Sequence, residues 1–204
     1  AMSVLPMIEV NAAGMKVTSD EDLFTERISY PGVPQNMQAY VARPKAEKKY
    51  PAVIVIHENR GLNAHIEDVT RRAAREGFLA IAPNALSAIG AAPANEDEAR
   101  QKFQELKAEN NLQNFINVYD YLGTRKDYNG SAGCVGFCWG GAMSNNLAVK
   151  LPGLKAAVAF YGRQAAAEDV DEPRNLAETD DLVSGDVGHV ALAEERQHVV
   201  LAHR

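Results

Sequence analysis

Four short runs of consecutive apolar residues constrain the fold of this chain more than any other feature. Each run is five residues long, and the four runs occupy residues 52–56, 78–82, 133–137 and 156–160. Segments with helical periodicity separate the runs. A run without polar alternation is typical of a strand buried on both faces of a parallel sheet. Strands that alternate with helices join through right-handed crossovers, which predicts an α/β fold with a mostly parallel, doubly wound sheet.

A pair of antiparallel strands precedes this alternating region. Residues 25–30 and 37–42 have strand-like patterns, and the sequence Pro-Gly-Val-Pro between them is typical of a hairpin turn. Segments with the apolar period of a helix predict three helices, over residues 66–77, 95–122 and 141–149. The first helix is expected to end at Gly77, and the strand over 78–82 to end at Pro83.

The chain has the length of one domain with atypical ends. Its 204 residues are enough for a single substantial core. Residues 1–20 predict an irregular arm, and residues 21–170 contain all the predicted strands and helices. Residues 171–204 differ in composition, because they hold eight acidic residues against three arginines and so most of the net charge of −6. We therefore expect one domain over 21–170, followed by an acidic tail.

Composition and charge exclude several classes of partner. A net charge of −6 gives no reason to expect nucleic acid or an anionic membrane. No apolar run approaches the roughly 20 residues that a membrane-spanning helix needs. The two cysteines, Cys134 and Cys138, lack the Cys-x-x-Cys spacing, and two thiols cannot form a disulfide framework for a chain of this length. We expect a cytoplasmic protein in which both thiols are free.

Cys138 lies at the centre of the motif with the most chemical content. The sequence Gly-Phe-Cys-Trp-Gly at 136–140 follows a buried strand and precedes a helix, which gives it the form of a nucleophile elbow. An elbow holds its central residue on a sharp turn above the sheet and needs small residues two positions to either side. The first amides of the helix, led by that of Trp139, then favour a thiolate and a developing oxyanion. Cys138 is therefore the candidate nucleophile.

Two other interpretations of this region fit the sequence less well. Most free cysteines are buried and inert, and we assign that role to Cys134 because it lies inside a predicted strand. The glycines of this segment lack the Gly-x-Gly-x-x-Gly spacing of a dinucleotide-binding loop. We therefore expect no cofactor.

Polar residues after the first buried strand form a second candidate group. Sites in parallel sheets lie at the carboxyl ends of the strands, where His57, Glu58 and Asn59 follow the run over 52–56. A carboxylate at this place can hold or accept a thiol proton, although a single glutamate is more often a surface residue. His57 and His65 do not have the spacing of a zinc motif, so we expect structural histidines and no metal.

Five segments carry motifs that are specific in combination. They are YPAVIVIHENRGLN at 50–63, IED at 66–68, EGFLAIAP at 76–83, GFCWGG at 136–141 and LKAAVAFYG at 154–162. With these motifs the chain resembles the dienelactone hydrolase family (carboxymethylenebutenolidases) from about residue 25 to residue 170. The resemblance implies an α/β-hydrolase fold and the opening of lactone rings by a cysteine nucleophile.

The resemblance also implies roles for individual residues. Cys138 matches the family's nucleophile, and Glu58 matches the glutamate that takes part in generating the thiolate when substrate binds. The amides of Trp139 and Asn59 match the donors of the oxyanion hole. Arg100 is a candidate partner for an anionic substrate, although a charged residue on a helix is more often simply solvated.

The end of the chain departs from the family pattern. The family continues with further strands that lead to a catalytic Asp and a catalytic His, and residues 171–204 are too short and too acidic to supply all of this. No apolar strand precedes Asp180, Asp181 or Asp186, and His189 is only three residues from Asp186. The sequence therefore predicts a sheet that lacks the last strands, and it does not identify a catalytic base.

Two functions are compatible with these observations. The first is a hydrolase of lactones or small carboxylic esters, which acts on a small molecule through an acyl-enzyme at Cys138. The second is a truncated, catalytically impaired domain that binds or self-associates, because a sheet without its last strands exposes an edge that favours a homodimer. Turnover of an activated ester would support the first, and a single acylation without turnover would support the second.

Overall fold

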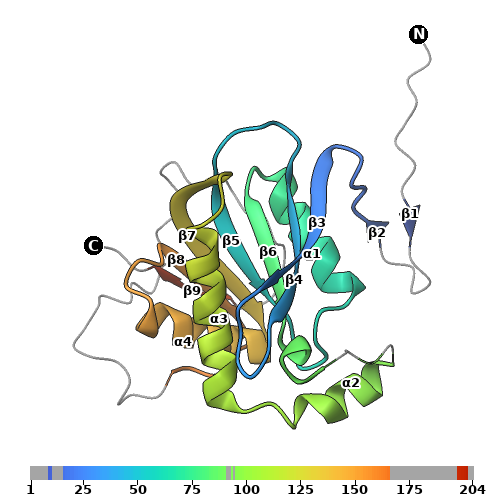
Figure 1. Ribbon diagram of the computed structural model, residues 1–204, viewed down its shortest axis with the longest axis vertical. Helices are drawn as coiled ribbons and strands as arrows, with labels where there is room; N and C mark the ends of the chain where they lie inside the picture. The colour runs from blue at the N-terminus through green and yellow to red at the C-terminus, as the bar shows by residue number, and fades with distance from the viewer. Residues whose placement is uncertain (1–8, 11–15, 91–92, 94, 166–196, 202–204) are drawn as a thin grey trace.

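One mixed sheet of seven strands organises the computed structural model, which describes residues 9–10, 16–90, 93, 95–165 and 197–201 (Figure 1). Two short strands, β1 (Glu9–Val10) and β2 (Lys16–Val17), pair separately and antiparallel. In spatial order the sheet contains β3 (Leu23–Tyr30), β4 (Met37–Pro44), β6 (Leu79–Asn84), β5 (Tyr50–Ile56), β7 (Tyr128–Phe137), β8 (Ala156–Phe160) and β9 (Gln197–Leu201).

The four predicted apolar runs form the parallel centre of this sheet. β5 pairs parallel with β6 on one side and with β7 on the other, and β7 pairs parallel with β8. The predicted hairpin is β3 and β4, which pair antiparallel, and β4 also pairs antiparallel with β6. The prediction of a mostly parallel sheet of α/β-hydrolase type with an antiparallel pair before it is confirmed.

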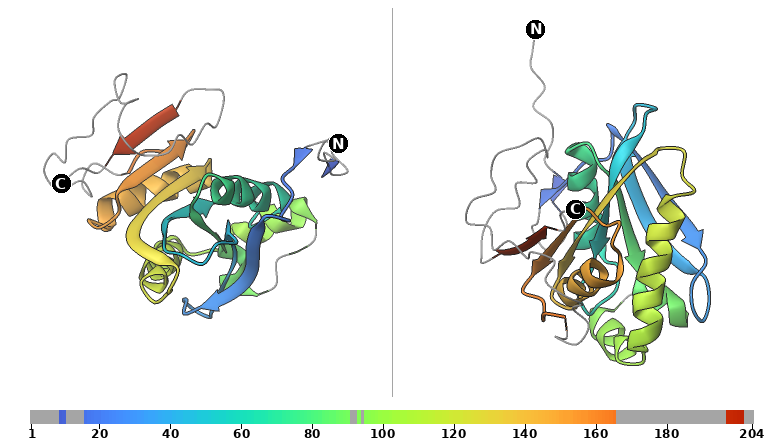
Figure 2. Two further views of the ribbon diagram at one scale, coloured as in Figure 1. Left: turned by 90° about the horizontal axis from the view of Figure 1, so that it is seen from above. Right: turned by 90° about the vertical axis from the view of Figure 1, so that its left-hand side faces the viewer.

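Helices cover both faces of the sheet (Figure 2). On one face α1 (Ala64–Arg75) packs Ile66 and Val69 against Val55 and Val135. The other face is covered by α3 (Ala108–Leu122) and α4 (Trp139–Lys150), whose buried side chains join the larger core cluster. Because the crossovers bring the parallel strands back in one direction, the carboxyl ends of β5, β6, β7 and β8 meet at one edge.

Local signals set the ends of α1. The side chain of Asn63 accepts a hydrogen bond from the amide of Ile66 at 3.1 Å, so the helix begins two residues before the apolar pattern does. At the other end Gly77 has a φ of 94°, a conformation that glycine adopts without strain. The predicted stop at Gly77 is confirmed. No helix in the described ranges is long and apolar enough to cross a bilayer.

The single helix that we predicted over 95–122 is two helices, α2 (Glu96–Phe103) and α3, so that prediction is wrong. The apolar residues explain the break. At about 100° per residue, Phe103 and Phe115 would point about 120° apart on one straight helix. Both are nevertheless buried in the same core, and a turn over 104–107 between the two helices makes this possible.

Pro83 does not end its strand, contrary to our expectation. β6 continues to Asn84 because β4 pairs with its last residues, Ala39 with Pro83 and Gln38 with Asn84. On the opposite side the pairing with β5 has already stopped at Ile81. Proline lacks an N–H group, and it is tolerated here because β6 has no pairing with β5 at this position. A short 3-10 helix, η1 (Ala85–Ile89), follows.

The sheet continues past β8 with one further strand, β9, which the sequence did not predict. β9 lies within the acidic segment 171–204 and pairs antiparallel with β8 over its whole length. The sequence signal was weak, because the apolar run at 199–202 has only four residues and lies among polar ones. An edge strand needs main-chain hydrogen bonds more than an apolar pattern. The edge of β8 that we expected to be exposed is therefore covered.

Candidate active site

Cys138 sits on a strained turn between β7 and α4. Its φ of 56° and ψ of −113° place it at the N-cap of α4 in a conformation that residues with a side chain rarely adopt. In the described chain only Cys138 and Tyr161 combine a side chain with a positive φ. Such strain persists only where the surrounding structure enforces it, and it concentrates at functional sites.

Direct backbone contacts enforce this turn. A Cβ atom on Gly140 would lie 2.6 Å from the carbonyl oxygen of His57 and would collide with that of Ile56. A Cβ atom on Gly141 would lie 2.7 Å from the carbonyl oxygen of Phe160 and 2.9 Å from the Cα of Gly162. The first turn of α4 therefore rests on the backbone at the ends of β5 and β8, with no side chain in between.

The backbone amides around Cys138 have distinct roles. The amide of Cys138 donates to the carbonyl oxygen of Phe160 at 3.0 Å, so it is not free to bind substrate. The amides of Trp139 and Asn59 have no hydrogen-bond partner among the described residues. Trp139 is the first residue of α4, where backbone donors are left without a helical acceptor. Both predicted oxyanion donors are therefore available.

Tyr161 lies beside Cys138 at the end of the neighbouring strand. Phe137 and Phe160, the last residues of β7 and β8, are paired in register and stack with their ring centroids 5.0 Å apart. Cys138 and Tyr161 directly follow them, and both adopt a positive φ. The sequence predicts that Tyr161 lies at the carboxyl end of a buried strand, but it indicates no chemical role for this residue.

The hydroxyl of Tyr161 connects this part of the site to Glu58. It donates a hydrogen bond to Oε1 of Glu58 at 3.0 Å. Desolvation of the phenol, the hydrogen bond to Glu58 and the negative charges of Glu58 and Cys138 raise the pKa of Tyr161 to about 12. The side chains of Cys138, Glu58 and Tyr161 therefore share one electrostatic environment at the carboxyl edge of the sheet.

His57 is a structural residue, as predicted. It is fully buried, its Nε2 accepts from the amide of Ala85 at 3.0 Å, and its Nδ1 lies 2.5 Å from the carbonyl oxygen of Glu58. This arrangement requires a neutral ring with the proton on Nδ1. Burial lowers the pKa of His57 to about 4, and the ring stacks on Trp139 at 5.5 Å. His57 thus fixes the backbone that precedes Asn59.

The remaining predicted residues lie outside this group. Arg100 is exposed on α2, where its ion pair is with Asp97 of the same helix at 3.9 Å. His65 is exposed, with its ring against Phe137. Cys134 is buried beneath the elbow, as predicted, and burial raises the pKa of its thiol to about 12.

Arg60 is a second residue that sequence reasoning missed. It directly follows Asn59 and binds Glu96 of α2 at 2.7 Å, while its Nε is buried without a hydrogen-bond partner in the described chain. Its position inside the motif at 50–63 was the available signal.

Four C-terminal residues considered for a catalytic triad lie outside the described residues: Asp180, Asp181, Asp186 and His189. Neither of the two histidines with described side chains, His57 and His65, forms a hydrogen bond with Cys138. Within the described ranges no three His, Cys, Asp or Glu side chains gather where they could hold a metal ion.

Comparison with known proteins identifies related sequences. A model of the dienelactone hydrolase family matches residues 37–199. An Escherichia coli K12 protein assigned as a carboxymethylenebutenolidase is 34% identical over 162 residues, which cover 77% of this chain and 59% of that protein. An E. coli K12 protein assigned as a hydrolase fragment is 42% identical over 95 residues, which cover 45% of this chain and 81% of the fragment.

Solved structures show the same relationship. A Klebsiella pneumoniae protein assigned as a dienelactone hydrolase superposes with a TM-score of 0.62 at 34% identity, and covers 71% of this chain and 62% of its own. A dienelactone hydrolase-like promiscuous phosphotriesterase from metagenomic libraries superposes with a TM-score of 0.59 at 26% identity, over 72% of this chain and 64% of its own.

Apart from the fragment, the matches cover most of this chain but only part of its relatives. The chain spans 59% of the length of its E. coli carboxymethylenebutenolidase relative. The family match runs from β4 into β9 and includes every strand end that surrounds Cys138. The chain therefore belongs to the dienelactone hydrolase family.

Proposed function

We propose that this protein hydrolyses lactones or small carboxylic esters through a covalent acyl-enzyme on Cys138. The observation that carries the proposal is the elbow itself, where Cys138 has a φ of 56° and α4 rests on the backbone of β5 and β8. Membership of a family named for lactone hydrolysis supports the same chemistry. The amides of Trp139 and Asn59 have no partner in the described part of the chain, and they suit the oxyanion that forms when a carbonyl is attacked.

The proposed reaction uses groups at this edge of the sheet. The sulfur of Cys138 forms a bond to the carbonyl carbon while its proton passes to the carboxylate of Glu58, and the amides of Trp139 and Asn59 stabilise the oxyanion. The carbon–oxygen bond of the lactone then breaks, and Glu58 returns the proton to the leaving oxygen. Water adds to the thioester, the carbon–sulfur bond breaks, and the sulfur takes up the proton that the water loses.

Replacement of Cys138 tests the proposal directly. We expect Cys138→Ala to abolish turnover of p-nitrophenyl acetate, with a loss of at least about 100-fold, because the nucleophile is gone. Intact-mass spectrometry of the wild type should show one acetyl group that disappears with time. Cys134→Ala is the matched control and should retain activity, since this thiol is buried. Equal activity in Cys138→Ala and wild type would refute the proposal.

The alternative of a binding or self-associating module is not better supported than hydrolysis. That interpretation required an exposed edge on β8, and β9 pairs along that edge. An acetyl group that forms once and never leaves Cys138 would bring the impaired domain back into consideration.

A further inference from the structure

The second strained residue of the described chain points to a role beyond packing. Cys138 and Tyr161 follow strands that are paired in register, and each turns into the left-handed region, with φ values of 56° and 43°. The amide of Cys138 donates to the carbonyl oxygen of Phe160, the residue before Tyr161. The two turns are therefore held together by the backbone.

Glu58 depends on Tyr161 for its orientation. Its carbonyl oxygen is fixed by Nδ1 of His57, but its carboxylate has the Tyr161 hydroxyl as its one hydrogen-bond partner among the described residues. Tyr161 is 64% exposed, so its ring is not retained to fill the core. The strained conformation of Tyr161 is better explained by its hydrogen bond to Glu58 than by burial, because the side chain is mostly exposed.

We propose that Tyr161 is a positioning residue, whose hydroxyl holds the carboxylate of Glu58 directed toward the sulfur of Cys138. This inference rests on the proposed function, because it assigns Glu58 the proton of the Cys138 thiol. A hydrogen bond donated to a carboxylate favours its ionised form. Since the pKa of Tyr161 is raised to about 12, the phenol keeps its proton and remains a donor throughout the neutral range.

The first test is the pH profile of Tyr161→Phe. This variant keeps the ring and removes the donor, so protonation of Glu58 becomes easier. We expect the acid limb of kcat/KM for p-nitrophenyl acetate to move about one unit to higher pH, with a loss of about 10-fold on that limb and much less on the plateau. Tyr119→Phe is the matched control, because its hydroxyl has no hydrogen bond in the described chain and it lies on α3. An unchanged limb, or a loss equal at every pH, would overturn the inference.

The second test does not require ester turnover. We would measure how the rate of Cys138 alkylation by iodoacetamide depends on pH, with the modified site read by mass spectrometry. Glu58→Gln should move the midpoint of this dependence to lower pH, because a facing negative charge is removed. Tyr161→Phe should move it to higher pH, because that charge loses its donor. The double variant with both substitutions should have the same midpoint as Glu58→Gln alone, because Tyr161 acts through Glu58.

The two tests separate the inference from the proposed function. If the wild type fails to turn over ester but the alkylation cycle shows coupling between Tyr161 and Glu58, the hydrolase proposal fails and the positioning role stands. If the wild type hydrolyses ester and the shifts caused by the two substitutions simply add, the positioning role fails and the hydrolase proposal stands.

Discussion

At the scale of single residues, Cys138 and His57 occupy contrasting environments. Cys138 is partly exposed on a strained turn, whereas His57 is buried, neutral and bonded at both ring nitrogens. A buried neutral histidine couples stability to pH. The pKa of His57 is about 4 in the folded protein, against about 6.5 for an unfolded histidine. The unfolded state therefore binds more protons between these two values.

The prediction for His57 follows from this difference. Its contribution to stability is complete above about pH 6.5 and is lost as the pH falls toward 4, by about 3 kcal/mol in total. Urea unfolding at pH 7 and pH 4 measures the change. In His57→Asn, whose amide offers one donor and one acceptor but does not titrate, the pH dependence should be smaller by about that amount. An identical pH dependence in both proteins would contradict the assignment.

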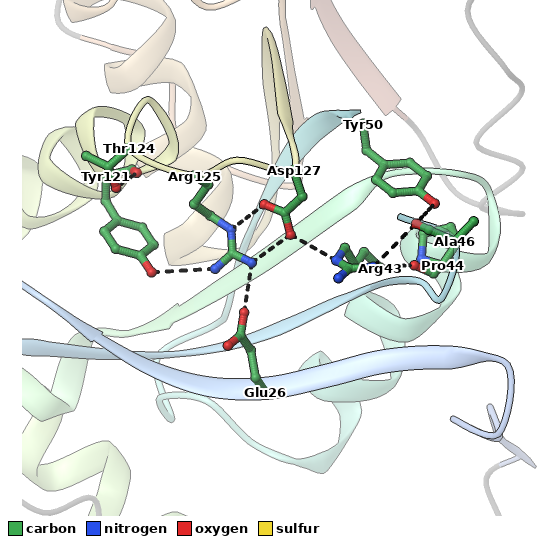
Figure 3. Close-up of polar contacts among 9 residues, drawn as sticks. All are labelled: Glu26, Arg43, Pro44, Ala46, Tyr50, Tyr121, Thr124, Arg125 and Asp127. Carbon is green, nitrogen blue, oxygen red and sulfur yellow. Dashed lines mark hydrogen bonds and ion pairs between the residues drawn. The ribbon is translucent and has the colours of Figure 1, made fainter. Parts of the chain in front are cut away.

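At the scale of secondary-structure elements, a network of ion pairs joins β3 and β4 to the start of β7 (Figure 3). The guanidinium of Arg125 contacts Asp127 and Glu26 at 2.8 Å, and Arg43 contacts Asp127 at 2.9 Å. Burial alone would raise the pKa of Asp127, but the hydrogen bonds and charge of Arg125 outweigh it and lower the pKa. The network lies at the amino end of β7, away from the strand ends that carry Cys138.

Removal of Arg125 should therefore affect stability and leave the chemistry alone. Arg125→Met leaves Asp127 and Glu26 with one partner fewer, and we expect the free energy of unfolding to fall by about 3 kcal/mol. The matched control is Arg27→Met, which breaks the exposed pair with Glu67 and should cost less than about 1 kcal/mol. Urea denaturation compares the two. Equal losses of unfolding free energy in the two variants would show that the partly buried position of the network adds nothing to stability.

The same scale shows what the sequence could predict. The apolar runs gave all four parallel strands because continuous burial on two faces leaves a strong pattern. The break between α2 and α3 was missed because each of the two helices has helical periodicity. Only the angle between Phe103 and Phe115 around one continuous helix axis reveals the break. The elbow could be predicted from spacing, whereas the hydrogen bond from Tyr161 to Glu58 could not, because it joins residues 103 positions apart.

At the scale of the whole molecule, β9 extends the sheet beyond β8 and forms its last strand. The pairing runs from Phe160 opposite Gln197 to Ala156 opposite Leu201. An uncovered strand presents unpaired backbone groups, which favours association with another chain.

Deletion of residues 197–204 is therefore expected to lower stability and promote concentration-dependent association. Deletion of 202–204 alone is the control, because it leaves β9 in place. Sedimentation velocity over a range of protein concentrations distinguishes the two. A monomer of unchanged stability after the longer deletion would show that β9 is dispensable.

The seating of α4 on bare backbone also limits how this scaffold can diversify. Gly140, Gly141 and Gly162 leave no side chain at the contact, so no series of larger or smaller residues can shift Cys138 by small steps. Any residue with a Cβ atom forces the helix off the sheet. Residues in the loops after β5, β6 and β8 can therefore change around the site while α4 and Cys138 keep their position.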